Sequence, residues 1–66
     1  MFGKIREDHP EYPGIIVLLS PIIPRSEAFE KGYCYTGRVL MDYGEEEEMD
    51  LKISDLASWS ANPEEL

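Results

Sequence analysis

Residues 33–54, YCYTGRVLMDYGEEEEMDLKIS, decide the fold because their hydrophobicity alternates at every second residue on both sides of an acidic run. The apolar and aromatic side chains fall at odd positions: Tyr33, Tyr35, Val39, Met41, Tyr43, Met49, Leu51 and Ile53. Successive side chains of a β-strand point to opposite faces of the sheet. The period therefore predicts two strands, at 33–43 and 48–54, each with an apolar odd face. Since the alternation resumes after the acids, they belong to a hairpin tip and not to a disordered tail.

The pairing of these two strands is restricted by the same alternation. A shift of one residue would turn a whole strand over, so both odd faces stay on the core side only if the loop length is odd. A three-residue turn near Gly44 and a five-residue loop over 44–48 both satisfy this condition. The three-residue turns place Val39 opposite Leu51 or opposite Met49, and the second of these also places Arg38 opposite Asp50.

The N-terminal third of the chain predicts one more strand. Residues 1–14 carry two prolines, two glycines and mixed charges, which indicates a loop or a short edge strand that ends at the Pro13–Gly14 turn. Residues 15–20, IIVLLS, are apolar at nearly every position and have prolines on either side, which indicates a strand buried on both faces.

Two short helical turns are predicted elsewhere. In RSEAFEKG, residues 25–32, Ser26 can cap the N-terminus and Gly32 can take the left-handed position after the last turn, while Phe29 is expected to dock on the sheet. In SDLASW, residues 54–59, a capped turn would place Leu56 and Trp59 on one face. Residues 60–66 are expected to fray.

These elements predict a single domain over residues 1–66. It is a small α+β or β-rich fold, with an antiparallel sheet of three or four strands and one or two short helical turns, and an SH3-like barrel is one form that it could take. A chain of this length buries only about 60% of its unfolded surface. With one cysteine, Cys34, it has no internal disulfide to reinforce the core.

The formal charge of the chain lies entirely in its last 25 residues. Residues 1–41 contain five acids and five bases, whereas residues 42–66 contain nine acids and one base, a net charge of −8. Binding to DNA or RNA requires lysine and arginine to displace counterions. We therefore expect no direct contact with nucleic acid and, if the charge has a function, a basic protein partner.

The acidic run has two main interpretations. If Glu46, Glu48 and Asp50 share one strand face, their carboxylates form a row about 6.6 Å apart, with Asp42 across the hairpin. Such a row resembles the phosphates along a nucleic-acid strand and could be bound by a basic surface. The same charges would also keep a small β protein soluble and block edge-to-edge pairing. A calcium loop would need alternating ligands and a central glycine, which DYGEEEE does not have.

No pattern for catalysis or for a cofactor is present. The single histidine, His9, and the single cysteine, Cys34, have no nucleophile–base motif around them, and phosphate-binding loops and zinc-binding patterns do not occur. The chain is expected to be non-enzymatic, without cofactor or metal. Its longest apolar run is about ten residues, whereas a membrane span needs about 20. With no signal-peptide pattern, a cytoplasmic location is expected.

Two resemblances extend this interpretation. Residues 31–56 resemble the central hairpin of SH3-like and Tudor-like barrels, and the matching residues are Gly32, Gly37, Val39, Gly44, Asp55 and Leu56. In size, charge and compactness the chain is similar to the small acidic anti-CRISPR proteins that phages encode against host defence, including those against type I systems. Many members of that class mimic DNA and occupy the nucleic-acid path of a Cas subunit.

The anti-CRISPR resemblance implies an inhibitor in the host cytoplasm, monomeric or homodimeric, that binds a basic, nucleic-acid-binding protein such as a Cas subunit. The residues that it implies for partner binding are Asp42, Tyr43, Glu45, Glu46, Glu47, Glu48, Asp50, Asp55, Glu64 and Glu65. The SH3/Tudor resemblance implies an alternative, an adaptor module that binds a peptide through its aromatic residues. In that case the acids only keep the protein soluble.

Overall fold

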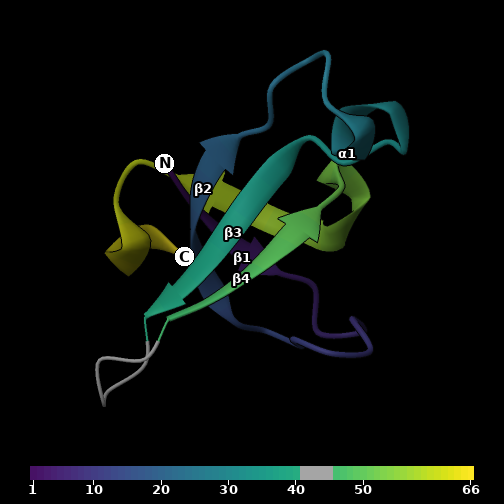
Figure 1. The fold of residues 1–66 in the computed structure, drawn as a ribbon. Helices are drawn as coiled ribbons and strands as arrows, with labels where there is room; N and C mark the ends of the chain where they lie inside the picture. The colour runs from purple at the N-terminus through teal and green to yellow at the C-terminus, as the bar shows by residue number, and fades with distance from the viewer. Residues whose placement is uncertain (41–45) are drawn as a thin grey trace.

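A computed structural model describes residues 1–40 and 46–66 of the chain. They form a small β-rich domain with a five-stranded antiparallel sheet, one short helix and two 3₁₀ turns (Figure 1). The elements are β1 (Phe2–Ile5), β2 (Ile16–Pro21), α1 (Glu27–Glu30), β3 (Tyr35–Leu40), β4 (Glu46–Leu51), η1 (Ile53–Asp55), β5 (Leu56–Ser60) and η2 (Pro63–Glu65). Among the described residues, none of the helices has the length and apolar character that a membrane span requires.

The strand order is β4-β3-β2-β1-β5, which makes β4 and β5 the two edges. Figure 1 shows β1 and β5 crossing behind β3 and β4, so the twisted sheet folds back over its own apolar face. Within the described residues no ladder joins β4 to β5. The SH3-like barrel expected as one form of the fold is therefore not formed, because the sheet is open.

The β3–β4 hairpin confirms that the odd faces of the two strands lie together, and corrects the predicted register. Val39 lies opposite Glu47, not opposite Leu51 or Met49, and Arg38 lies opposite Glu48 instead of Asp50. A turn at Gly44 falls outside the described residues. The alternative prediction, a five-residue loop over 44–48, is wrong because Glu46–Glu48 belong to β4.

In the observed register, side chains of β4 pack against Gly37. It pairs with Met49, and a Cβ atom placed on it would lie 2.7 Å from Leu51 Cδ1 and 3.0 Å from Met49 Sδ. Leu51 and Met49 therefore fill the space that the missing side chain leaves. β4 ends at Leu51, and Ile53 lies in the 3₁₀ turn η1 rather than in the strand predicted over 48–54.

The N-terminal half of the sheet differs from the sequence prediction in two respects. β1 is an interior strand between β2 and β5, not a loop or an edge, and its Ile5 is fully buried. β2 is buried on one face only: Val17 and Leu19 are in the core, whereas Ile16 is 41% exposed. The reason is that α1 has only four residues and no described helix covers the outer face of β2.

The segment after η1 is a strand and not the predicted helical turn. β5 pairs with β1, and the pairing passes from Leu56 directly to Ser58, so Ala57 is the extra residue of a β-bulge. The bulge shifts the alternation by one residue, which brings Leu56 and Trp59 onto the same face. The shared face was predicted correctly, but its cause is the bulge and not a helical repeat.

The short helix α1 begins as predicted. The Ser26 side chain accepts a hydrogen bond from the Phe29 amide at 3.2 Å, and Gly32 after the helix has a φ of +95°, which favours glycine. Phe29, however, is 42% exposed, so the expectation that it docks on the sheet is wrong. The C-terminus forms the 3₁₀ turn η2, capped by the Asn62 side chain, where fraying was expected.

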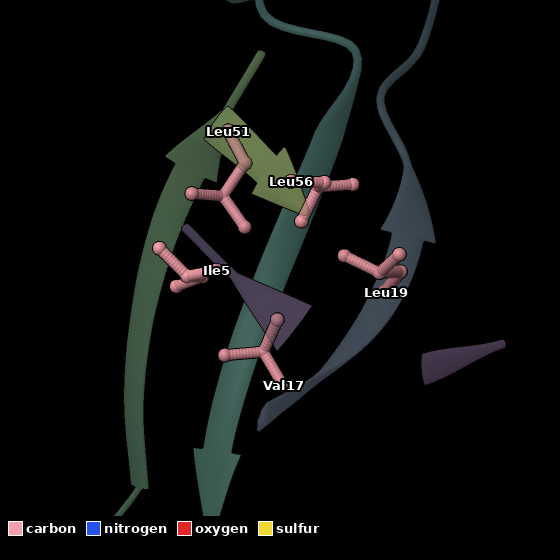
Figure 2. Close-up of a cluster of buried hydrophobic side chains, with 5 residues drawn as sticks. All are labelled: Ile5, Val17, Leu19, Leu51 and Leu56. Atoms are coloured by element: carbon pink, nitrogen blue, oxygen red, sulfur yellow. The ribbon is translucent and has the colours of Figure 1, made fainter. Parts of the chain in front are cut away.

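The core consists of five side chains from four strands (Figure 2). They are Ile5 from β1, Val17 and Leu19 from β2, Leu51 from β4 and Leu56 from β5. Tyr12, Tyr35, Val39 and Met49 pack around this cluster. Because Leu51 and Leu56 meet in one core although their strands are opposite edges of the sheet, the core fixes the position of both edges.

Candidate functional site

The strongest concentration of charge on the described surface lies on the edge strand β4. Three acidic residues of this strand have described side chains, Glu47, Glu48 and Asp50, and we call this group the acidic edge; the side chain of Glu46 lies outside the described part of the structure. Glu48 and Asp50 are exposed and have the same parity, so they lie on one face about 6.6 Å apart along the strand. The predicted pairing of these two carboxylates in one row is consistent with the observed strand.

One cation partly neutralises this row. The Arg38 guanidinium on β3 donates to Glu48 Oε1 from Nη2 at 3.0 Å and from Nε at 3.2 Å. Both side chains are about half exposed, so the pair is screened by solvent and adds little to stability. Thr36 lies opposite Asp50, and among the described residues the Asp50 carboxylate has no hydrogen-bond or salt-bridge partner.

Glu47 has a structural contact instead. It belongs to the odd face, and its Oε1 accepts a hydrogen bond from the Tyr12 hydroxyl at 2.7 Å. This hydrogen bond, burial and the negative charges of Glu47 and Glu11 all raise the pKa of Tyr12. The contact joins the segment between β1 and β2 to the acidic edge. His9 supports that segment, because its Nδ1 accepts hydrogen bonds from the amides of Glu11 and Tyr12.

The other predicted partner-binding residues do not extend the acidic edge. Asp55 is half-buried, and its carboxylate accepts a hydrogen bond from the Lys52 amide at 2.9 Å at the start of η1. Glu64 and Glu65 follow β5, at the opposite edge of the sheet, and Glu65 accepts a hydrogen bond from the Ser60 hydroxyl at 2.8 Å. Asp42, Tyr43 and Glu45 lie outside the described residues.

The described residues offer no metal-binding cluster: no group of three or more histidine, cysteine or acidic side chains is arranged to hold an ion. Cys34 is half-buried, and its thiol lies 3.8 Å from the Gly32 carbonyl oxygen. An open depression of about 790 Å³ is lined by residues of mixed charge around Lys4, Arg6 and Glu65.

A second surface, on β5, was missed by sequence reasoning. Trp59 is 57% exposed and borders a cavity of about 130 Å³. The other residues that line the cavity are apolar or aromatic: Met1, Leu19, Tyr35, Ile53 and Leu56. The uncharged stretch LASWS between two acidic segments was the available signal for it.

Comparison with protein-family models, curated proteins and solved structures found no match to this chain.

Proposed function

We propose that this protein is a non-enzymatic inhibitor that binds the basic, nucleic-acid-binding surface of another protein through its acidic edge. The observation that carries the proposal is the exposed Glu48–Asp50 face of the edge strand β4. The acids stand on a regular strand, so their spacing is set by the backbone and little order has to be imposed on binding.

The type of partner follows from the charge. The chain carries a net charge of −8, and its carboxylates would attract lysine and arginine side chains while repelling phosphate. A surface rich in those cations is typical of a protein that binds nucleic acid. The resemblance in size and charge to anti-CRISPR proteins makes the Cas subunits of a host CRISPR complex the first partners to test.

The alternative of an SH3- or Tudor-like adaptor has less support. Tyr12, Tyr33 and Tyr35 are half-buried, and Tyr12 is engaged by Glu47. The Tyr33 ring is covered on one face by the Lys52 ammonium, whose Nζ lies 5.3 Å from the ring centroid. These three rings do not form the exposed cluster that an aromatic cage needs. Trp59 is exposed, so a peptide contact through this aromatic residue of the described surface would be made at β5.

The test compares two double variants with the same change in net charge. Glu48→Gln/Asp50→Asn removes two charges from the acidic edge, and Glu7→Gln/Glu30→Gln removes two exposed charges elsewhere. Each protein is immobilised and incubated with nuclease-treated host lysate, and bound proteins are eluted with duplex DNA. We expect nucleic-acid-binding proteins to be eluted from the wild type and from the control variant, but not from the acidic-edge variant.

Two further results bear on the same proposal. Capture should fall steeply between low and high salt, because exposed charge pairs are screened. Expression of the protein in a strain with an active type I CRISPR system should restore phage plating, and the acidic-edge variant should not. Equal capture by both double variants would contradict a role for the acidic edge.

A further inference from the structure

The second edge of the sheet, β5, differs from β4 in having no charged residue. Its sequence is LASWS, whereas natural edge strands are commonly protected by charges, prolines or a covering segment. Neither lysine nor proline lies within β5, and the bulge at Ala57 interrupts the edge near one end only. The half of β5 around Trp59 is therefore a regular strand with an unprotected edge.

The direction of the N–H and C=O groups on β5 follows from the backbone hydrogen bonds that β1 makes. The Ile5 amide donates a hydrogen bond to the Ile15 carbonyl at 2.8 Å, and the Met1 carbonyl accepts one from the Leu19 amide at 2.8 Å. The odd-numbered residues here therefore form their backbone hydrogen bonds with the β2 side of the sheet. The even residues of β1 must then bond to β5, because N–H and C=O groups alternate in direction along a strand.

The partners of these even residues are Ser58 and Ser60, opposite Lys4 and Phe2. Trp59, opposite Gly3, therefore directs its own N–H and C=O away from the sheet. No other part of the described chain forms a hydrogen bond with them. Trp59 thus offers one donor and one acceptor at the spacing that an added antiparallel strand requires.

The apolar cavity lies beside this pair of groups. In an antiparallel ladder, directly opposite residues carry their side chains on the same face of the sheet. A residue placed opposite Trp59 by an added strand would therefore point to the side where Trp59, Leu19 and Leu56 line the cavity. The cavity volume of about 130 Å³ suits one aliphatic side chain, since a cavity of about 150 Å³ holds one benzene.

We propose that β5 binds an extended segment of a partner protein as a sixth, antiparallel strand, with one aliphatic side chain of that segment in the cavity beside Trp59. The segment carries lysine or arginine on both sides of its aliphatic residue. This follows from the acids at the two ends of β5: Asp55 precedes the strand, and Glu64 and Glu65 follow it. Backbone pairing provides affinity and the cavity provides selectivity, as in other cases of strand addition.

A second copy of this chain is a poorer occupant. Pairing of two β5 strands about Trp59 would place two tryptophans opposite each other, and neither would supply an aliphatic side chain to the cavity. It would also bring together two chains that each carry a net charge of −8. The charge therefore favours a basic segment over self-association.

The proposal is tested with a blocked seven-residue peptide, Lys-Lys-Thr-Leu-Thr-Lys-Lys, titrated into the ¹⁵N-labelled protein. The control peptide has glycine in place of the central leucine and the same charge. We expect the leucine peptide to shift the amide signals of residues 56–60, to slow hydrogen exchange of the Trp59 amide, and to bind at least tenfold more tightly than the control. In the Glu48→Gln/Asp50→Asn variant the leucine peptide should keep its tenfold advantage over the glycine control, so failure here and failure of the proposed function are distinguishable.

Trp59→Pro supplies a second variant, because it removes an outward-pointing N–H that the β1–β5 ladder does not use, together with the ring that borders the cavity. Its binding of the leucine peptide should be lost while the β1–β2 amide signals stay unchanged. Three results would overturn the proposal: equal binding of both peptides with shifts confined to β4, no shift of the wild-type signals at millimolar peptide, or dimerisation of the wild type through β5.

Discussion

Gly37→Ala should destabilise the domain, because the core leaves no room for a methyl group at this position. A Cβ atom on Gly37 would lie 2.7 Å from Leu51 Cδ1 and 3.1 Å from Val17 Cγ2. Carbon atoms in contact prefer about 3.5–4.0 Å. Leu51 and Val17 are almost completely buried, so neither can move aside without displacing another core residue.

The expected size of the effect combines two opposing contributions. Overpacking of a core costs about 1–3 kcal/mol. Replacing glycine by alanine also restricts the unfolded chain, which offsets about 0.4–1 kcal/mol. The net loss is about 1–2 kcal/mol, out of a total of roughly 3–10 kcal/mol for a domain of this length. Since 1 kcal/mol moves the Tm of a small domain by about 4–8 °C, the Tm should fall by about 5–15 °C.

Gly3→Ala is the matched control. Its Cβ would lie 2.8 Å from Leu19 Cδ1 and 3.1 Å from Leu56 Cδ2, which are distances similar to those at Gly37. Leu19 and Leu56, however, line the cavity beside Trp59 and can move into it. We expect a decrease in Tm of less than about 4 °C, that is, below 1 kcal/mol.

Thermal unfolding should be followed by far-ultraviolet circular dichroism, since Trp59 is already 57% exposed in the folded state and its fluorescence would change little. Equal Tm values for the two glycine variants would refute the argument that free space beside the core decides the cost. A Gly37→Ala protein as stable as the wild type would refute the packing of Leu51 against Gly37.

Three further predictions concern single contacts. The raised pKa of Tyr12 means that its contact with Glu47 stabilises the fold fully below the ordinary tyrosine pKa and is lost as the pH rises through the raised value. In an absorbance titration, Tyr12→Phe should remove a phenol that ionises above the ordinary tyrosine pKa, and Glu47→Gln should lower the pKa of Tyr12; an unchanged curve would contradict the contact. Ser26→Ala should cost about 0.5–2 kcal/mol in urea unfolding through loss of the helix cap, and Ser26→Asp should retain most of that stability, whereas equal stability of all three would contradict capping. Arg38→Gln should change stability by less than about 1 kcal/mol, yet it should increase capture of basic proteins at low salt, because the cation beside Glu48 is removed; weaker capture would argue against the acidic edge.

The sequence predicted the faces of the central hairpin but not its register. Period-two alternation is a local property, so the odd apolar face of β3 and β4 could be read directly. In the observed register, Leu51 from the neighbouring strand fills the empty side-chain position of Gly37. Such a contact is long-range, and several odd loop lengths were equally compatible with the alternation.

β1, predicted as a loop or a short edge strand, and β5, predicted as a helical turn, have weak local signals for physical reasons. β1 has four residues, including a glycine and a lysine, and becomes an interior strand only because β2 and β5 pair with it. In β5 the bulge at Ala57 places Leu56 and Trp59 on one face at a spacing of three, which imitates a helical turn. The same contrast holds for the candidate site. The shared face of Glu48 and Asp50 is a local property and was predicted, whereas the role proposed for Trp59 depends on the order of the strands in the sheet.

The two edges of this sheet have opposite chemistry, and that difference makes the two proposed interactions separable by salt. On β4, Glu47, Glu48 and Asp50 oppose strand addition and leave charge as the means of recognition, so binding there should weaken as ionic strength rises. On β5, backbone hydrogen bonds and an apolar cavity provide most of the binding, so salt weakens only the contribution of the flanking lysines and arginines. If one partner uses both edges, loss of Glu48 and Asp50 should weaken its capture at low salt, and loss of Trp59 should weaken its capture at low and at high salt. Such behaviour would require both edges to bind, one basic surface at β4 and one extended segment at β5.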